Sequence, residues 1–391
     1  MSIKLKISGL FFSVFILLAA PATQAAPAAQ AVSNCDPDGV QSSGSIYRIC
    51  LPPPAQYNGD LIIWAHGFQD AGTPVQIPED QLNLGGIQIN EIVNLLGFGF
   101  ATNSYSKTGL AVQEGMADIL DLVNIYTAQY GAPQRIFLTG ASEGGLITTL
   151  LIEQNPGPGI FTAGVAACGP IGSFPYQINY FGDARVTFEY FFPGLIPGDL
   201  FDPPQAIVDD WANYYETEVK PVVFDPANQA KLNQWVSVAK LPYDSADYLN
   251  TVAISVQDVL RYSVVNSADA TATLGGFPYF NMNRIYTGSD DDVLLNQLVQ
   301  RFSADPAAIV EMQNNYNTSG HLDIPLVTMH TTRDQQVPYR HQQIYTLKTF
   351  ASGDLGSNHI PIRVDRFEHC NFNLTEVITA LFLMLNLGGG I

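Results

Sequence analysis

Short apolar segments alternate along this chain with segments whose apolar residues recur at helical spacing. The segments that predict strands cover residues 60–65, which are apolar along most of their length, and 98–105, 135–139, 161–167, 325–330 and 360–367. The segments with helical spacing cover residues 86–96, 116–130, 144–154 and 374–387. Strands that are apolar along their whole length are buried on both faces, which is typical of a parallel sheet wrapped by helices. The sequence therefore predicts an α/β architecture.

The alternation stops between Ile171 and Asp323 and then resumes. The stretch between them carries 23 of the chain's 43 aromatic residues, and its spacing predicts helices over residues 229–240 and 246–265. Because strands of the sheet type follow it, we expect an insertion packed over the sheet as a cap, and not an independent downstream domain. The predicted division is a signal peptide at 1–26, the first part of the core at 27–170, the cap at 171–323 and the second part of the core at 324–391.

The N-terminus has the pattern of an export signal. Lys4 and Lys6 precede an apolar run over residues 7–20, and small residues follow, with cleavage expected after Ala25 or Ala26. The apolar run is shorter than the roughly 20 residues that a membrane-spanning helix needs. We therefore expect a secreted or periplasmic protein with no membrane anchor after cleavage.

Composition excludes several classes of protein. Hydrophobic residues make up 47% of the chain and charged residues 14%, which rules out a disordered chain. The formal net charge is −19, and so acidic a surface repels nucleic acid and anionic membranes. The sequence has neither a Cys/His cluster at metal-ligand spacing nor a glycine-rich phosphate loop, so we expect no metal and no cofactor.

Four cysteines, Cys35, Cys50, Cys168 and Cys370, suggest disulfides in an exported protein, and four cysteines allow three pairings. A bond between Cys35 and Cys50 would close a short loop near the mature N-terminus and stabilise the fold by about 3 kcal/mol. Cys168 and Cys370 then remain, either as a second disulfide or as buried free thiols.

The sharpest motif is the sequence GASEG at residues 140–144, between a predicted strand and a predicted helix. In a G-x-S-x-G turn of this kind, small neighbours let the backbone pass close while the serine is exposed at the edge of the sheet. The amide dipoles of the following helix point at the serine and favour a developing negative charge. We therefore interpret Ser142 as a nucleophile, the alternative being an ordinary glycine-rich turn.

A nucleophilic serine needs a base, and the base needs an acid to orient it. Of the six histidines, His369 follows the predicted strand 360–367, and Asp334 follows the predicted strand 325–330. We predict His369 as the base and Asp334 as the acid. The alternative for His369 is a capping role on the last helix, and His66 is expected to form hydrogen bonds within its own turn.

Other carboxylates are weaker candidates for the acid. Asp290 to Asp292 follow Ser289, and we expect Ser289 to cap a helix whose first turn holds these acids, in preference to a calcium site. Asp365 lies inside a predicted strand, and Glu368 is the direct neighbour of the predicted base. Asp334 therefore remains the preferred acid.

Two backbone N–H groups are predicted to bind the oxyanion that forms when the serine attacks. One belongs to Glu143, the residue after the candidate nucleophile. The other is expected in the turn after strand 60–65, where we choose Phe68 ahead of its neighbour Gln69. Both groups act through the backbone, so a side-chain substitution is a poor test of either.

Several fragments together resemble one family. They are WAHGF at 64–68, SYSKTGLAVQEG at 104–115, GASEGG at 140–145, HTTRDQQVP at 330–338 and HCNF at 369–372. This set is similar to the secreted bacterial α/β-hydrolases often labelled prolyl-oligopeptidase-like, and the likeness runs from about Tyr47 to the end of the chain. The resemblance implies an α/β-hydrolase fold with a large, mainly helical cap, and a triad of Ser142, Asp334 and His369 in that chain order.

Two positions depart from related patterns. Glu368 stands where many members of the family have Gly before the histidine, and we expect this acidic side chain to raise the pKa of the histidine or to narrow the mouth of the site. Tannase-type and feruloyl-esterase-type hydrolases tie the Cys after the histidine to a Cys beside the serine. Ala141 occupies that place here, so that disulfide is not expected.

The leading hypothesis for function is a secreted serine hydrolase that cleaves carboxylic esters, small or oligomeric, with apolar acyl or aryl groups. Four cap aromatics are predicted to line its substrate pocket, namely Tyr180, Phe181, Phe188 and Tyr190; the alternative is that they pack in the core of the cap. A second hypothesis keeps the triad but cleaves peptides or amides. A third is an inactive hydrolase fold used for binding.

Overall fold

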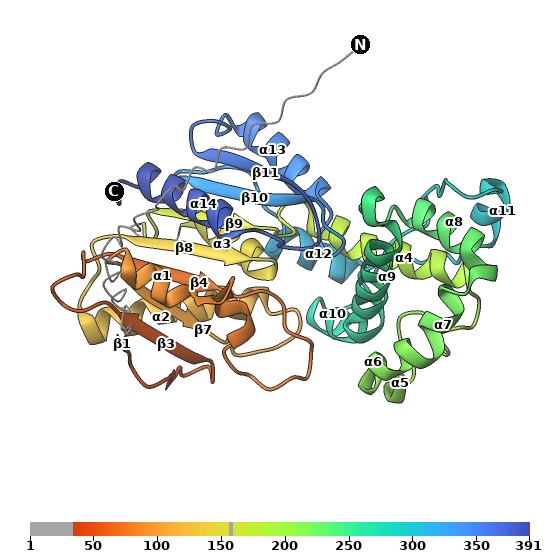
Figure 1. The fold of residues 1–391 in the computed structure, drawn as a ribbon, viewed down its shortest axis with the longest axis horizontal. Coiled ribbons are helices and arrows are strands. Elements are labelled where there is room, and N and C mark those ends of the chain that lie inside the picture. The colour runs from red at the N-terminus through yellow and green to blue at the C-terminus, as the bar shows by residue number, and fades with distance from the viewer. Residues whose placement is uncertain (1–33, 156–158) are drawn as a thin grey trace, which may run out of the picture. The chain divides into compact units, whose positions relative to one another are not determined.

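The computed structural model describes residues 34–155 and 159–391, so the predicted signal peptide lies outside the described residues. The main sheet has nine strands in this part of the chain, in the order β1-β3-β7-β4-β8-β9-β10-β11 with β2 beside β3 (Figure 1). The strands are β1 (Asn34–Cys35), β2 (Gly39–Val40), β3 (Ile46–Leu51), β4 (Leu61–Ala65), β7 (Gly99–Asn103), β8 (Ile136–Ala141), β9 (Ala163–Ala167), β10 (Leu326–Arg333) and β11 (His359–Phe367). β3 runs antiparallel to β7, and the strands from β7 to β11 are parallel to one another. The predicted, mostly parallel sheet is confirmed.

Helices cover both faces of this sheet. One face carries α2 (Val112–Tyr130), α3 (Glu143–Gln154) and α13 (Arg340–Ser352), and the other carries α1 (Ile89–Leu95) and α14 (Leu374–Leu387). In β4, Leu61 and Ile63 pack into the hydrophobic core shared with α2 and α3, whereas Ile62 packs into the core shared with α1 and α14. Because successive strand residues point to opposite faces, a strand covered on both sides must be apolar throughout.

The insertion between β9 and β10 is mainly helical. Its helices are α4 (Phe174–Phe191), α5 (Gln205–Asp209), α6 (Trp211–Tyr214), α7 (Lys220–Val223), α8 (Gln229–Ala239), α9 (Tyr248–Val265), α10 (Ser267–Thr273), α11 (Asp292–Leu298) and α12 (Pro306–Asn315). Most of them share a hydrophobic core of their own. At its centre Trp235 of α8 packs edge-on against Phe188 of α4, with ring centroids 4.9 Å apart. We call this part of the insertion the cap.

Both ends of the insertion pack with the sheet instead. Phe174 at the start of α4 and Met312 of α12 belong to the hydrophobic core that α2 and α3 share with the sheet. Ser289 does not cap a helix as predicted: the N-cap of α11 is Asp291, whose side chain accepts from the N–H of Leu294 at 2.9 Å. Ser289 donates to the carboxylate of Asp292 instead, because the chain enters the helix two residues later than its composition suggests.

Two disulfides link segments of the described chain. Cys35–Cys50 joins β1 to β3, and Cys168–Cys370 joins the end of β9 to the loop that follows β11. The second bond lies beside the residues predicted to carry the chemistry. Among the described helices, none combines the length and the apolarity needed to cross a bilayer.

Candidate active site

Ser142 stands at a sharp turn between β8 and α3. Its backbone has φ 58° and ψ −122°, a conformation that residues with a side chain rarely adopt and that costs on the order of 1–3 kcal/mol. Such strain persists only where the surrounding structure imposes it, and it presents the serine side chain at the carboxyl edge of the sheet. The N–H of Ser142 donates to Ala167 at the end of β9 (2.9 Å), which fixes the turn against the neighbouring strand.

Two glycines make this turn possible. A Cβ added to Gly140 would lie 2.3 Å from the carbonyl oxygen of Gly144, and one added to Gly144 would lie 2.1 Å from that of Ala65. The motif therefore needs glycine at both positions because strand, turn and helix pass one another in backbone contact. A strained serine elbow after a central strand, in a parallel sheet with an antiparallel edge, decides the fold. The chain has an α/β-hydrolase fold.

His369 and Asp334 come together from two neighbouring loops. The loop after β11 carries His369, and the loop after β10 carries Asp334. The Nδ1 of His369 lies 2.7 Å from Oδ2 of the fully buried Asp334. A carboxylate accepting from Nδ1 leaves Nε2 as the basic nitrogen of the ring. His369 and Ser142 line one cavity, without a direct hydrogen bond between them in the described chain.

A second imidazole, which the sequence analysis did not select, also contacts Asp334. The Nε2 of buried His330 lies 3.4 Å from the Oδ2 of Asp334 and 2.8 Å from the carbonyl oxygen of Val337. The N–H groups of Gln336 and Val337 donate to Oδ1 of Asp334 at 2.9 and 2.8 Å. Burial by itself would raise the pKa of Asp334, but His369 and His330 outweigh it and lower the pKa below its usual value. Asp334 is therefore held as a carboxylate.

Phe68 and Glu143 are the residues whose amides are predicted to bind the oxyanion. Phe68 and Glu143 both line a cavity with Ser142, and no hydrogen bond within the described residues occupies either backbone N–H. The side chain of Glu143 is buried, and its Oε1 accepts from the N–H of Ala111 at 2.9 Å. Burial raises the pKa of Glu143 to about 8, although the bond from Ala111 acts in the opposite direction. At neutral pH the side chain next to the candidate nucleophile is therefore mostly protonated.

The histidine loop has an unusual backbone. Glu368 has φ 85° and Cys370 has φ 51°, in the left-handed region that favours glycine. This explains why a glycine suits the position of Glu368. Its side chain is exposed, while its carbonyl oxygen accepts from the hydroxyl of Thr331 at 2.9 Å. The disulfide to Cys168 anchors the loop from the other side of His369.

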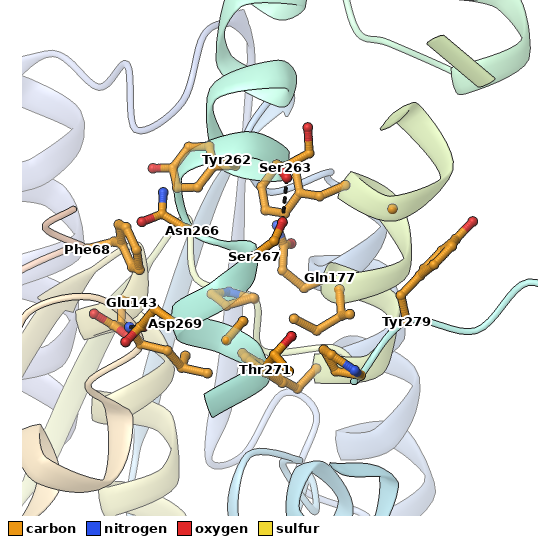
Figure 2. A pocket seen from close by; sticks show the side chains of 18 of the residues that line it. Phe68, Glu143, Gln177, Tyr262, Ser263, Asn266, Ser267, Asp269, Thr271 and Tyr279 are labelled. Atoms are coloured by element: carbon orange, nitrogen blue, oxygen red, sulfur yellow. Dashed lines mark hydrogen bonds between the residues drawn. The ribbon is translucent and has the colours of Figure 1, made fainter. Parts of the chain in front are cut away.

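Ser142 lies where two apolar cavities meet. The cap cavity, of about 140 Å³, lies between Ser142 and the cap helices α4, α9 and α10. Figure 2 shows Phe68 and Glu143 on one side of it and Gln177 on the other. The sheet cavity, of about 390 Å³, lies between the sheet and helices α1 and α14, and His369 and Cys370 also line it.

Of the four cap aromatics predicted to bind substrate, Phe181 lines the cap cavity. Its ring stacks on that of Tyr262 of α9, with centroids 4.9 Å apart. Tyr180, Phe188 and Tyr190 line neither cavity and pack in the core of the cap, which α4 shares with α8 and α9.

Tyr262 and Gln336 border both cavities and were not predicted from the sequence. Gln336 lies two residues after Asp334, which is a signal that sequence reasoning had at hand. The hydroxyl of Tyr262 donates to Oε1 of Gln336 at 3.0 Å. Nothing in the helical spacing of α9 distinguishes Tyr262 from its neighbours.

The other histidine assigned from the sequence, His66, bonds locally as expected. Its Nδ1 lies 2.6 Å from the carbonyl oxygen of Gly67, and its ring stacks on Tyr105. Burial lowers the pKa of His66 to about 4. His66 is therefore neutral at physiological pH and supports the turn that carries Phe68.

The sulfurs of Cys168 and Cys370 and the imidazole of His369 lie within 4.8 Å of one another, a spacing that metal ligands adopt. A metal site of this kind needs thiolates. Both sulfurs are joined in the disulfide, so this group does not offer them.

No family model matches the chain, and no curated protein matches it. Solved structures similar to it include an esterase of Pyrococcus furiosus, with 10% identity, a TM-score of 0.45 and 90% of each chain covered. Lipase A of Candida antarctica in its closed state has 14% identity and a TM-score of 0.45, over 90% of this chain and 76% of that one. An acylaminoacyl peptidase of Pyrococcus horikoshii has 11% identity and a TM-score of 0.41, over 86% of this chain; the chain spans 37% of that peptidase.

Proposed function

We propose that this protein is an exported serine hydrolase that cleaves carboxylic esters of apolar acyl or aryl groups, oligomeric esters included. Ser142 Oγ attacks the ester carbonyl carbon while its proton passes to Nε2 of His369, which Asp334 orients. The N–H groups of Phe68 and Glu143 bind the oxyanion. The carbon–oxygen bond to the alcohol then breaks, and the alcohol oxygen takes the proton from His369.

Water completes the cycle. His369 takes a proton from a water molecule, whose oxygen attacks the acyl carbon, and the bond between that carbon and Ser142 Oγ breaks. The proton returns to Ser142 Oγ and the acid is released. No cofactor enters any of these steps.

One observation carries the proposal. Ser142 occupies a strained elbow and borders the same cavity as His369, whose Nδ1 is bonded to a buried carboxylate. The apolar linings of the two cavities around Ser142 suit an ester with hydrocarbon on both sides of the carbonyl. The two disulfides agree with export.

Peptide cleavage has weaker support. A peptidase that holds a free amino terminus needs carboxylates near its nucleophile, and Glu143 and Asp269 do line the cap cavity. Glu143 is neutral at neutral pH because its pKa is raised to about 8. Asp269 is engaged by Lys107 at 3.5 Å and by the N–H of Leu110 at 2.7 Å. Both carboxyls already have partners within the protein, which weakens the case for a site that holds a free amino terminus.

The test compares initial rates of the purified protein on p-nitrophenyl esters and on peptide p-nitroanilides that include Xaa-Pro. We expect ester hydrolysis, with kcat/KM lowered roughly 10⁴-fold or more in Ser142→Ala. Ser357→Ala removes an exposed hydroxyl that lines neither cavity and serves as the matched control. Anilide cleavage faster than ester cleavage would establish a peptidase. A protein that a fluorophosphonate does not label at Ser142 would be an inactive hydrolase fold.

A further inference from the structure

Two cavities at one nucleophile raise the question of which part of an ester each one holds. The proposed reaction divides its substrate at the carbonyl carbon, with the acyl group on one side and the alcohol on the other. One difference between the two linings bears directly on the reaction. His369 borders the sheet cavity together with Ser142, whereas in the described residues the cap cavity is bordered by Ser142 and Glu143 without His369.

Proton transfer fixes the assignment. The alcohol oxygen must receive its proton from Nε2 of His369, so it has to lie within hydrogen-bonding reach of that nitrogen when its bond to carbon breaks. The alcohol therefore begins beside His369, and the hydrocarbon attached to it extends into the cavity that His369 borders. The acyl group extends from the same carbon to the other side of Ser142.

The deacylation step points the same way. After the alcohol has left, the attacking water must lie beside His369, which takes its proton. If the acyl chain filled the sheet cavity, the acyl-enzyme would exclude water from the base. If the alcohol fills the sheet cavity instead, its departure opens the space beside His369 that the water needs.

We infer that the sheet cavity is the binding site for the alcohol part of the substrate and that the cap cavity holds the acyl part. This assignment rests on the proposed function. The sheet cavity measures about 390 Å³, within the roughly 300–1,000 Å³ of small-molecule sites, and the cap cavity about 140 Å³. The substrate class is thus an ester of a short acyl group with a long or bulky apolar alcohol.

The wall of the sheet cavity agrees with an apolar occupant. Ile62, Val165 and Met329 line it from three strands of the sheet. Ile92 of α1 and Ile378 of α14 face them from the two helices that cover this side, and both are partly exposed. A hydrocarbon chain placed there removes apolar surface from water on both its faces, at about 25 cal/mol for each Å² buried.

A pair of isomeric esters tests the assignment without a change in overall hydrophobicity. Octyl acetate carries its long chain on the alcohol, and methyl nonanoate carries it on the acid. We expect the wild-type protein to prefer octyl acetate by about tenfold or more in kcat/KM. Hydrolysis of both isomers is followed by titration of the released acid.

Two matched substitutions to tryptophan, one in each cavity, show which cavity holds which part of the ester. Ile378→Trp fills the sheet cavity and is expected to lower the octyl acetate to methyl nonanoate ratio about tenfold. Ala270→Trp fills the cap cavity, which Ala270 lines, and is expected to raise the same ratio. Should Ile378→Trp lose the wild-type thermal transition, Ile92→Phe narrows the same cavity from α1 and replaces it.

A wild-type preference for methyl nonanoate would overturn the assignment. So would the reverse pattern in the variants, in which Ile378→Trp raises the octyl acetate to methyl nonanoate ratio and Ala270→Trp lowers it. Equal shifts in both variants would overturn it too, since the cavities would then not separate the two parts of the substrate. A protein that cleaves p-nitrophenyl esters but neither isomer also contradicts it. A protein that cleaves no ester at all contradicts the proposed function itself, so the two failures are distinguished.

Discussion

The sheet core and the cap contribute to the candidate site in different ways. The core fixes its parts by backbone contact and by a covalent bond: the elbow of Ser142 is enforced by Gly140 and Gly144, and the histidine loop is tied to β9 by the Cys168–Cys370 disulfide. The cap holds other loops of the site by polar side chains. Helix α9 makes several of these contacts.

The contacts of α9 reach two loops. Arg261 forms an ion pair with Asp70, close to Phe68 in the loop after β4. Asp258 accepts from the side-chain amides of Gln335 and Gln336, in the loop of Asp334, at 2.7 and 2.9 Å. The comparison teaches that the candidate nucleophile and base are held by the core, whereas the loops that carry Phe68 and Asp334 also have polar contacts to the insertion.

The largest effect is expected from a substitution in the core that keeps the shape of the site. Asp334→Asn retains acceptance from the N–H groups of Gln336 and Val337 but removes the negative charge that faces Nδ1 of His369. We expect kcat to fall by about 10⁴-fold, because the imidazole is no longer held in the right tautomer. Ester hydrolysis across a pH series measures it. A loss below tenfold would exclude Asp334 as the acid.

The second prediction concerns the covalent bond in the core. The Cys168–Cys370 disulfide links residues 202 apart, and by loop entropy its removal in a double alanine variant lowers the free energy of unfolding by about 5 kcal/mol. The matched control is the double alanine variant at Cys35 and Cys50, 15 residues apart, with an expected loss of about 3 kcal/mol. Denaturant unfolding gives both values. We expect kcat to fall in the first variant only, and equal kcat losses would contradict an anchoring role for the bond to the histidine loop.

The third prediction tests whether the cap helps to place the loop that carries Phe68. Arg261→Ala removes the ion pair to Asp70 and frees the loop that carries Phe68, so we expect kcat to fall about tenfold while KM changes less. Arg261→Lys keeps the positive charge and should restore part of the rate. A variant that changes KM alone would mean that Arg261 acts on substrate access and not on the placement of the loop.

The smallest expected effect is a pH dependence at the boundary between core and cap. The pKa of Glu143 is raised to about 8, so its carboxyl is neutral below that pH and charged above it; Asp269, Glu114 and Lys107 are the charged groups that act on it. A carboxylate beside the oxyanion opposes the developing charge by about 1 kcal/mol, or about fivefold in rate. We expect kcat/KM to decline above pH 8 in the wild-type protein.

Glu143→Gln is the control for that decline, since its amide oxygen can still accept from Ala111. The kcat/KM of this variant should not fall above pH 8. If it falls as in the wild-type protein, a group other than Glu143 causes the fall. Because folding raises the pKa of Glu143, its contribution to stability is complete below the unfolded value near 4.5 and is lost as pH rises through about 8. Thermal unfolding of the two proteins as a function of pH measures this difference.

Much of the fold could be predicted from the sequence. The strands β4, β8 and β9 are short and mostly apolar because helices cover both of their faces, and this leaves a local signal. The elbow was visible because backbone crowding demands glycine on each side of Ser142. The structure also brings Asp334 and His369 into hydrogen-bonding contact, as expected from their places after neighbouring strands. Their catalytic roles remain predictions.

The cap was predicted less well because its aromatic residues carry no mark of which way they face. Phe181 and Phe188 lie seven residues apart in α4, yet the first lines a cavity and the second is buried in the core of the cap. The contact of His330 with Asp334 was missed because a buried histidine within an apolar strand looks like any other core residue.

The sequence by itself determined the order of strands and helices, the elbow of Ser142 and the loops that carry Asp334 and His369. These follow from local periodicity and from the steric needs of a few glycines. Only the tertiary structure decided that Ser142 lies between two cavities and that α9 joins the cap to two loops of the site. Such contacts join side chains far apart in the sequence, 77 residues for Asp258 and Gln335 and 191 for Arg261 and Asp70. The free energy of each contact is set by packing that no local pattern records.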